Sequence, residues 1–247
     1  MSHSPTEADL VAQFSTALPL ITPQAFSTAG VVYRAVFLKY LTRPNPNALF
    51  DRGPMRTPQR FSPPSLHGIE TEAFGLQPVD KPDGLDLSPG ETDSVFPGLY
   101  VAEDYDTAYL EAHQLDSKTP RPTRLQRHLS AVSILGLDIG DTSFQLLDLT
   151  QDTVLNTLGM TRRQVTYRHW RRRNMVTNNR HGKWAPTQIL GFLAYRDGRF
   201  QGIRYPSARN RGKPCIFIFT QRLVRGIHRI TVGDNPDCCG LALEAVP

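Results

Sequence analysis

Short strand-like runs alternate with helical segments in this chain, without the regular strand–helix–strand rhythm of a parallel sheet. Strand-like runs cover residues 31–38, 98–102, 129–139, 143–149, 202–207, 214–220 and 223–231. Helical patterns cover residues 4–18, 104–115, 152–158 and 187–196. The first helix opens on Ser4-Pro5-Thr6-Glu7, which has the form of a capping box, and it carries Leu10, Phe14 and Leu18 on one face. This order predicts an α+β fold with a mixed, largely antiparallel sheet and flanking helices.

The length of the chain and the placement of its prolines predict one domain. A chain of 247 residues can bury one sizeable core. Half of the 20 prolines lie between Thr42 and Gly98, where apolar runs are few. Within that stretch, residues 77–97 are rich in Pro, Asp, Gly, Ser and Glu, which is typical of an exposed insertion. Strands on both sides are needed for one core, so we expect a single domain over residues 1–247.

Composition narrows the class of protein. The net charge of +5 and the pI near 9.3 favour anionic partners. Three cysteines without a CxxC spacing, and histidines without metal-ligand spacing, predict a reduced protein with no metal site. No run is as long as a membrane span, and the N-terminus lacks the pattern of a signal peptide. We therefore expect a soluble, cytoplasmic protein with no membrane association.

Glu111 is the most informative candidate for chemistry. It follows Tyr100 by eleven residues, in a stretch that reads as a strand running into a helix. At about 100° per residue, Glu111 lies at the edge of that helix's apolar stripe. The stripe consists of Tyr105, Ala108, Tyr109, Ala112 and Leu115. A carboxylate at such an edge is partly shielded from water, which suits a group that faces a developing positive charge, and Tyr100 at the strand end is within reach of the same cleft.

Two arginines and one serine complete the set of candidates. Arg34 lies in the middle of an apolar strand, where an unpaired guanidinium is costly and requires an anionic partner. Arg60 lies in the proline-rich stretch, and two guanidinium groups suit a pyrophosphate because each binds it bidentately. Each arginine taken alone is more often structural. Ser207, after Tyr205-Pro206, is by itself more often a turn residue, and without a Gly-x-Ser-x-Gly elbow it does not predict a hydrolase nucleophile.

Together these residues resemble the RES domain family, which is named for its Arg, Glu and Ser residues. The resemblance begins with Val-Tyr-Arg-Ala-Val at 32–36 and Gln-Arg-Phe-Ser at 59–62. It continues with Gly-Leu-Tyr-Val-Ala at 98–102, Thr-Ala-Tyr-Leu-Glu at 107–111 and Gly-Ile-Arg-Tyr-Pro-Ser-Ala-Arg at 202–209. It covers about residues 30–220 in the family's order. Two departures stand out: Phe61 replaces the usual Trp of Gly-Arg-Trp, and the segment between Arg60 and Tyr100 is longer than in the family.

The resemblance implies a fold similar to that of ADP-ribosyltransferase toxins and NAD as a substrate that is consumed, with no cofactor. It assigns Arg34 and Arg60 as the family's two arginines, and Tyr100, Glu111 and Ser207 as its Tyr, Glu and Ser. Glu111, Arg34 and Ser207 would then act in catalysis, and Arg34, Arg60, Tyr100 and Ser207 would bind NAD. Many members are the toxin of a toxin–antitoxin pair, so a protein inhibitor is an expected partner.

The reaction implied is cleavage of the bond between nicotinamide and ribose. Glu111 would stabilise the oxocarbenium-like ribose. The two arginines would bind the phosphates, Tyr100 would stack on nicotinamide or its ribose, and Ser207 would hydrogen-bond that ribose. Water as acceptor gives an NAD glycohydrolase, which we take as the expected activity. Phosphate as acceptor gives an NAD phosphorylase, and a protein side chain gives an ADP-ribosyltransferase.

The alternative from another class is a basic module that binds nucleic acid. Residues 162–173 hold six arginines interleaved with Tyr167 and Trp170, the residue types that contact phosphates and stack on bases. A solvated basic loop or helix is the ordinary interpretation of such a segment, and docking of an acidic inhibitor is a third. Nucleic acid is therefore the less favoured partner. The sequence leaves the oligomeric state, including a homo-oligomer, open.

Overall fold

The computed structural model describes eleven stretches of the chain, residues 5–27, 30–37, 60–62, 85, 96, 98–113, 132–140, 143–166, 184–224, 227–232 and 242–244. The helices among them are α1 (Glu7–Ala17), α5 (Tyr105–His113), α6 (Asp152–Thr157), α7 (Arg162–Thr166) and α9 (Pro186–Asp197), with the 3-10 turns η1 (Leu18–Leu20) and η3 (Thr220–Arg222). The strands are β1 (Gln24–Phe26), β2 (Val31–Phe37), β3 (Gly98–Ala102), β4 (Val132–Asp138), β5 (Phe144–Asp148), β6 (Gly202–Pro206), β7 (Pro214–Phe219), β8 (Arg229–Val232) and β9 (Ala242–Glu244).

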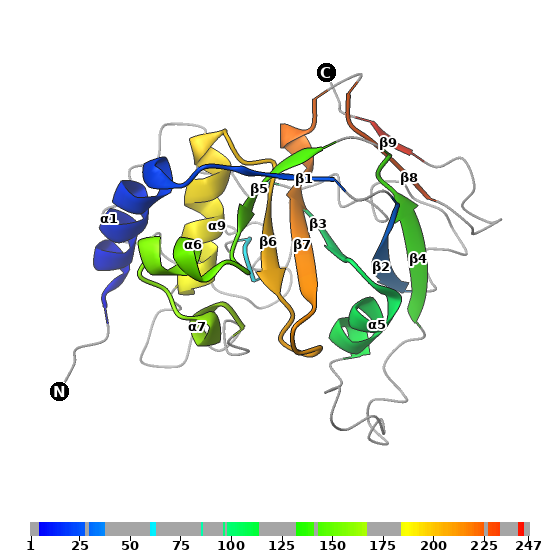
Figure 1. Cartoon of the computed structure of the whole chain (residues 1–247), viewed down its shortest axis with the longest axis horizontal. Helices are drawn as coiled ribbons and strands as arrows, with labels where there is room; N and C mark the ends of the chain where they lie inside the picture. The colour runs from blue at the N-terminus through cyan, green and yellow to red at the C-terminus, as the bar shows by residue number, and fades with distance from the viewer. Residues whose placement is uncertain are drawn as a thin grey trace, which may run out of the picture.

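The described strands form one sheet in the order β1-β5-β6-β7-β3-β2-β4-β8-β9 (Figure 1). Strands β5 and β6 pair in parallel, and the other neighbouring strands with a described register are antiparallel. The predicted α+β fold with a mixed, largely antiparallel sheet is confirmed. In the middle of the sheet, β3 runs antiparallel to both β7 and β2, and its pairing with β2 is reduced to one register pair, Tyr33 with Ala102.

The sheet is curled, and it buries apolar side chains on both faces. The rings of Phe144 in β5 and His228 just before β8 are in tilted contact, with centroids 5.0 Å apart, although five strands lie between β5 and β8 in the sheet order. Alternate residues of β7 divide between two cores: Phe217 and Phe219 face the helices, and Ile216 and Ile218 face the other side. The central strands of the sheet are buried on both faces, which explains why they are continuous apolar runs in the sequence.

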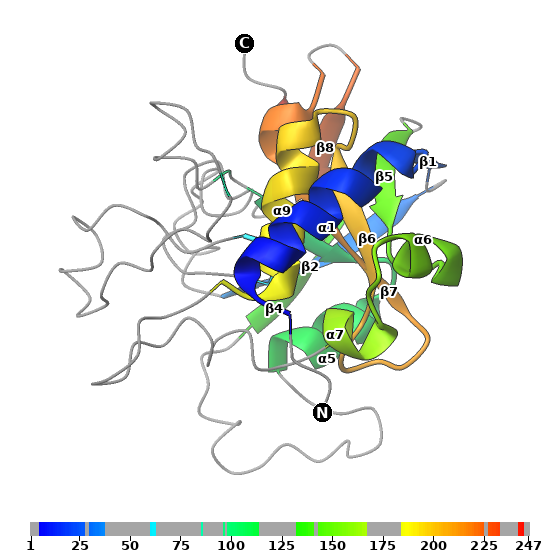
Figure 2. The same cartoon turned by 90° about the vertical axis from the view of Figure 1, so that its left-hand side faces the viewer.

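Helices α1 and α9 pack on one another over the helical face of the sheet (Figure 2). Leu10, Phe14 and Leu18 are buried, as the sequence pattern of the first helix predicts. The predicted cap is shifted: Thr6, rather than Ser4, is the N-cap, and it forms a capping box with Asp9. A threonine hydroxyl satisfies the backbone N–H of the first turn as well as a serine does.

Two other sequence expectations change, and one is described only in part. Residues 223–231 are not one strand, since a 3-10 turn precedes them and β8 begins at Arg229. Leu85 and Phe96, the two described residues of the segment 77–97, are buried, so that segment is not an exposed insertion at these positions. In the basic segment only residues 162–166 are described, as α7, and Arg162 forms an ion pair with Asp152 at 2.9 Å. Residues 167–173 lie outside the described part.

The described residues form neither a membrane-spanning helix nor a metal-binding cluster. Among them, no helix is both long and apolar enough to cross a membrane. Likewise, within the described ranges no three His, Cys, Asp or Glu side chains gather closely enough to hold a metal ion.

Candidate functional site

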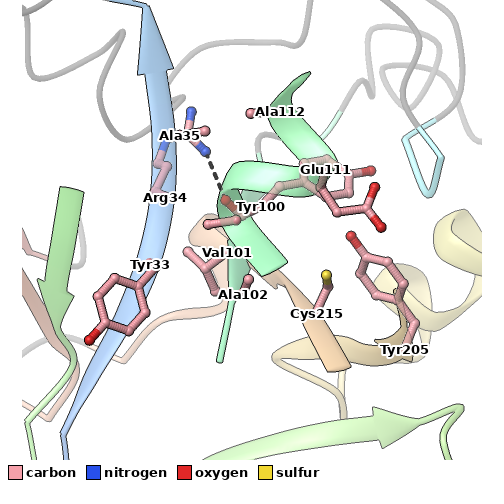
Figure 3. A pocket seen from close by; sticks show the side chains of 11 residues that line it. Tyr33, Arg34, Ala35, Tyr100, Val101, Ala102, Glu111, Ala112, Tyr205 and Cys215 are labelled. Atoms are coloured by element: carbon pink, nitrogen blue, oxygen red, sulfur yellow. Dashed lines mark hydrogen bonds between the residues drawn. The ribbon is translucent and has the colours of Figure 1, made fainter. Parts of the chain in front are cut away.

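A cavity of about 240 Å³ opens where α5 crosses the central strands (Figure 3). Eleven described residues line it: Tyr33, Arg34, Ala35, Tyr100, Val101, Ala102, Ala108, Glu111, Ala112, Tyr205 and Cys215. Of these, Arg34 and Glu111 are the only charged groups, and three tyrosines supply most of the aromatic surface. The volume is slightly below the range of about 300–1,000 Å³ that is usual for small-molecule sites, so it suits one end of a larger ligand.

One register row of the sheet contributes four of the lining residues. Tyr205 pairs with Cys215, Cys215 with Ala102, and Ala102 with Tyr33. Directly paired residues of neighbouring strands lie side by side across the sheet. The small residues Cys215 and Ala102 lie in the middle of this row, between two tyrosines. The cavity therefore exists because two small residues occupy the sheet centre where larger ones would fill the space.

Three donors hold one oxygen of the Glu111 carboxylate. Its Oε1 accepts from the Ser207 hydroxyl at 2.5 Å, from the backbone N–H of Ala208 at 2.8 Å and from that of Arg209 at 3.2 Å. No described residue donates to Oε2 in the hydrogen bonds of this structure. In Figure 3 the carboxylate lies beside the phenol of Tyr205. The Glu111 carboxylate is thus fixed through one oxygen, and the other accepts no hydrogen bond from a described residue.

All hydrogen-bonding capacity of the Ser207 hydroxyl is used inside the protein. Besides donating to Glu111, Ser207 Oγ accepts from the backbone N–H of Arg209 at 3.0 Å and of Asn210 at 2.9 Å. A hydroxyl offers one donor and two acceptor positions, so none remains for a substrate. The sequence expectation that Ser207 hydrogen-bonds the ribose therefore does not match its contacts here: Ser207 orients Glu111 instead.

A second set of contacts ties this turn to the start of α5. Asn210 Nδ2 donates to the hydroxyl of the fully buried Thr107 at 2.8 Å. The backbone N–H and hydroxyl of Thr107 donate in turn to the two carboxylate oxygens of Asp104, at 2.9 and 2.8 Å, which caps the helix. We call Thr107, Glu111 and residues 207–210 the carboxylate clamp. It fixes α5 and the β6–β7 turn relative to one another at two points.

Arg204 belongs to the same motif as Ser207, residues 202–209, and has a structural role. Its guanidinium binds Glu103, between β3 and α5, through two bonds of 2.6 and 3.1 Å, and reaches Asp148 at 3.1 Å. The hydrogen bonds to Glu103, more than any other cause, raise the pKa of Arg204. This partly buried network joins the ends of β3, β5 and β6, which supports the strand ends from which the site residues project.

Arg34 of β2 and Tyr100 of β3 line the cavity on neighbouring strands. Arg34 Nη1 donates to the backbone carbonyl of Tyr100 at 3.3 Å. The Tyr100 ring stacks on Phe217 with centroids 4.3 Å apart, and its hydroxyl accepts from the backbone N–H of Phe61 at 3.0 Å. The sequence suggested that Tyr100 ends its strand, but β3 continues to Ala102.

Arg60 lies next to the cavity rather than in its wall. Its guanidinium carbon is 5.2 Å from the centroid of the Tyr205 ring, and its Nη1 is buried without a hydrogen-bond partner among the described residues. The following residue, Phe61, is fully buried against Tyr205, with centroids 4.8 Å apart. A buried guanidinium nitrogen without an acceptor is costly, which fits a position that an anionic ligand completes.

The thiol and phenol of the cavity stay neutral. Burial, followed by the nearby charge of Glu111, raises the pKa of Cys215, which Arg60 partly offsets. Burial above all, and then Cys215, raises the pKa of Tyr205, again with Arg60 acting in the opposite sense. A cysteine whose thiol is kept protonated is not an activated nucleophile. The cavity therefore offers one anionic group and positive charge near it, and no thiolate.

The structure brings the five predicted residues into one neighbourhood. Arg34, Tyr100 and Glu111 line the cavity, Ser207 binds Glu111, and Arg60 lies over Tyr205. Their roles in catalysis and binding stay predictions. The helix stripe was partly wrong: Ala108 and Ala112 line the cavity, but Tyr105 and Tyr109 are 52% and 39% exposed.

Sequence reasoning missed Tyr205 and Cys215. Residues two apart on a strand share a face, and Tyr205 precedes Ser207 by two. That spacing was the signal for Tyr205. Cys215 follows from the pairing of Tyr205 with Cys215, which requires the strand register. Asn210 of the carboxylate clamp gave no sequence signal, and Thr107 opens the motif Thr-Ala-Tyr-Leu-Glu at 107–111, which assigned it no role.

The family model of the RES domain matches residues 31–237. The chain belongs to the RES domain family. Among solved structures it is similar to a chain of the crystal structure of the MbcT–MbcA toxin–antitoxin complex of M. tuberculosis, with a TM-score of 0.52 and 17% identity over 91% of this chain and 89% of that chain. At this identity the likeness concerns the fold. No curated protein matches the chain.

Proposed function

We propose that this chain is an NAD glycohydrolase that cleaves the bond between nicotinamide and ribose. The observation that carries the proposal is the state of Glu111, whose Oε1 is held by three donors while Oε2 is left toward a cavity with a single carboxylate. Membership of the RES family supports NAD as the substrate. The positive charge of Arg34 in the wall and of Arg60 nearby supports a ligand with phosphates.

A single carboxylate suits this bond better than an ordinary glycosidic bond. Glycosidases that cleave O-glycosides use two carboxyl groups, one of them as the acid that protonates the leaving oxygen. Nicotinamide leaves as a neutral base from a cationic linkage and needs no acid. What the reaction requires is stabilisation of the positive charge that develops on the ribose, which a preorganised carboxylate supplies.

The other residues bind and orient the substrate in this proposal. Arg34 and Arg60 hold the two phosphates, and the neutral phenols of Tyr100 and Tyr205 contact the nicotinamide riboside. Ser207 acts through Glu111 because its hydroxyl has no free position for the ribose. Water attacks the ribosyl carbon, its proton passes to bulk solvent, and ADP-ribose, nicotinamide and a proton are the products.

We further propose that the chain acts in the cytoplasm as the toxin of a toxin–antitoxin pair, with a protein inhibitor as its partner. The support is the family together with the fold that it shares with a chain of the MbcT–MbcA complex. Loss of NAD arrests growth, so expression of the chain in a bacterial host should stop growth in step with a fall in cellular NAD, and the Glu111→Gln variant should not.

The decisive test is incubation of the purified protein with NAD, followed by mass analysis of the products. We expect nicotinamide and ADP-ribose in equal amounts. Replacing Glu111 by Gln removes the charge and keeps the size, so the rate should fall by roughly 10²–10³-fold, the scale of losing a preorganised electrostatic contact. Asp106→Asn on the exposed face of the same helix is the matched control and should keep the wild-type rate.

The same assay separates the other acceptors. Runs with and without inorganic phosphate distinguish ADP-ribose from its 1-phosphate, the product of a phosphorylase. A mass increase on the protein or on added lysate protein identifies an ADP-ribosyltransferase. Unchanged NAD under all of these conditions would refute the proposed function, and a salt-sensitive gel shift without NAD loss would favour the nucleic-acid-binding alternative.

A further inference from the structure

Residues 60–62 are anchored to helix α9 by unusually close contacts. Gly191 of α9 lies under the backbone of Phe61: a Cβ added at Gly191 would be 2.0 Å from the Phe61 carbonyl oxygen and 2.8 Å from its carbonyl carbon. Gln188, one turn earlier on the same face of α9, donates from Nε2 to the backbone carbonyl of Ser62 at 3.3 Å. A helix interior disfavours glycine, so its presence here is explained by the close approach of the second backbone.

The opposite side of the segment is fixed from the sheet. The backbone N–H of Phe61 donates to the Tyr100 hydroxyl at 3.0 Å. The Phe61 ring lies against Tyr205 and stacks on Phe217, with centroids 4.8 and 6.2 Å away. Phe61 and Ser62 are both completely buried. Three residues thus bind to a helix on one side and to three strands on the other. We call this assembly, residues 60–62 with Tyr100, Gln188 and Gly191, the arginine anchor.

The anchor ends at a guanidinium with a free hydrogen-bonding position. Arg60 lies over the Tyr205 ring, and its Nη1 is buried without an acceptor among the described residues. Arg60 and Glu111 act in opposite senses on the charge states of Tyr205 and Cys215, so both charges lie close to these two groups. A displacement of the Phe61 backbone would move Arg60 relative to Glu111, which is held independently by the carboxylate clamp.

We propose that Gly191 and Gln188 are positioning residues for Arg60, and that α9 sets where the phosphates of the substrate bind by holding residues 60–62 against the cavity. The inference rests on the proposed function for the identity of the ligand. It adds that a helix with no residue in the cavity wall determines affinity for the dinucleotide, through contact with a backbone.

The test is the Gly191→Ala variant. Alanine is the better helix former, so the substitution would stabilise α9 if no backbone lay above it. Because Phe61 does lie above it, we expect the segment to be displaced. The KM for NAD should rise roughly tenfold, the effect of losing about one hydrogen bond to a charged group, with kcat nearly unchanged. Gln188 also accepts from the Ala185 N–H and caps the helix, so Gly191 is the cleaner probe.

Two controls tie the effect to Arg60. Arg60→Ala should raise KM to the same degree, and the double variant should be no worse than Arg60→Ala, since Gly191 acts only through Arg60. Leu193→Ala on the same helix, two positions from Gly191 and buried in the core, should lower the melting temperature without changing KM. If the KM of the double variant rose by the product of the two single effects, the proposal would be overturned.

Hydrogen exchange makes the outcome independent of the reaction. The Phe61 N–H is bonded to Tyr100, so a peptide covering residues 60–62 should exchange faster in Gly191→Ala and at the wild-type rate in Leu193→Ala. Unchanged exchange in Gly191→Ala would refute the anchor even if NAD turnover fell. Loss of protection in a protein that does not consume NAD would refute the proposed function and leave the anchor standing.

Discussion

Glu111 and Arg60 lie near the same two side chains, Tyr205 and Cys215, but they are held in different ways. The carboxylate clamp fixes Glu111 by hydrogen bonds that end on the functional group itself, at 2.5, 2.8 and 3.2 Å. The arginine anchor fixes the backbone beside Arg60 through a packed phenylalanine and a glycine contact, and no described residue accepts a hydrogen bond from the buried Nη1 of Arg60. Glu111 is therefore fixed at its carboxylate, whereas Arg60 is fixed through the neighbouring backbone.

This difference fits the work that each charge would do. Stabilising a transition-state charge requires an oxygen in a fixed position before the reaction begins, which directional hydrogen bonds provide. Binding a phosphate requires a group whose donors are still unsatisfied, which packing of the neighbouring backbone provides without using them. We therefore expect changes in the carboxylate clamp to affect kcat and changes in the arginine anchor to affect KM.

Among the residues that hold Glu111, Ser207 should give the largest effect when it is replaced by alanine. The substitution removes one donor from Glu111 and the Ser207 acceptor of the Asn210 backbone N–H, while the Arg209 N–H keeps Glu111 as an acceptor at 3.2 Å. A hydrogen bond to a charged group is worth about 1.5–3 kcal/mol, so kcat should fall by about ten- to a hundredfold. The KM for NAD should stay within about twofold of wild type in steady-state assays.

Ser15→Ala, at an exposed position of α1, is the matched control and should leave both constants unchanged. A rise in KM for Ser207→Ala with little change in kcat would contradict the clamp. That result would return Ser207 to the role that the sequence suggested, a hydrogen bond to the ribose.

Asn210→Ala should have a smaller effect on the same constant. Asn210 reaches Glu111 only through the β6–β7 turn, by tying it to Thr107. A neutral hydrogen bond is worth about 1 kcal/mol, so kcat should fall about fivefold. Asn210→Asp cannot donate to Thr107 while it is ionised, and its charge opposes that of Asp104 close by. It should lose more activity than Asn210→Ala at neutral pH; wild-type activity of Asn210→Asp would exclude this coupling.

The sequence predicted part of the site, and the difference between the surroundings of Glu111 and Arg60 explains which part. The strand runs and the helix over 104–115 correctly assigned Tyr100 to a strand and Glu111 to the following helix, because apolar periodicity reports which elements form and which face is buried. The family pattern added Arg34, Arg60 and Ser207. It could not predict that Ser207 uses every position of its hydroxyl on the protein, since this depends on the exact path of residues 207–210.

The contacts of the arginine anchor could not be predicted from the sequence. Gly191 reads as an unremarkable residue in an apolar helix, and Phe61 as a substitution for the family's tryptophan. Their contact joins positions far apart in the chain, and a missing side chain leaves no pattern that periodicity can detect. Tyr205, in contrast, was within reach, because its spacing of two from Ser207 places both on one face of a strand.

Cys215 lies between the two charges and can report on both. Burial, then the charge of Glu111, raises its pKa above the ordinary value of 9.0, and Arg60 acts in the opposite direction. The folded state therefore binds the thiol proton more tightly than the unfolded state does. The stability from this source is fully present below pH 9.0 and is lost as the pH rises above it.

Thermal unfolding followed between about pH 7 and about pH 11 should show this loss, and Cys215→Ala should reduce it. In a background that carries Cys238→Ser and Cys239→Ser, the two charge variants should then move the pKa of Cys215 in opposite directions. Glu111→Gln should lower it and Arg60→Ala should raise it, while burial keeps it above 9.0 in both. Equal shifts in the same direction would mean that the variants act by changing packing around the thiol. Opposite shifts require that both charges remain close to Cys215, one held by hydrogen bonds and the other by packing.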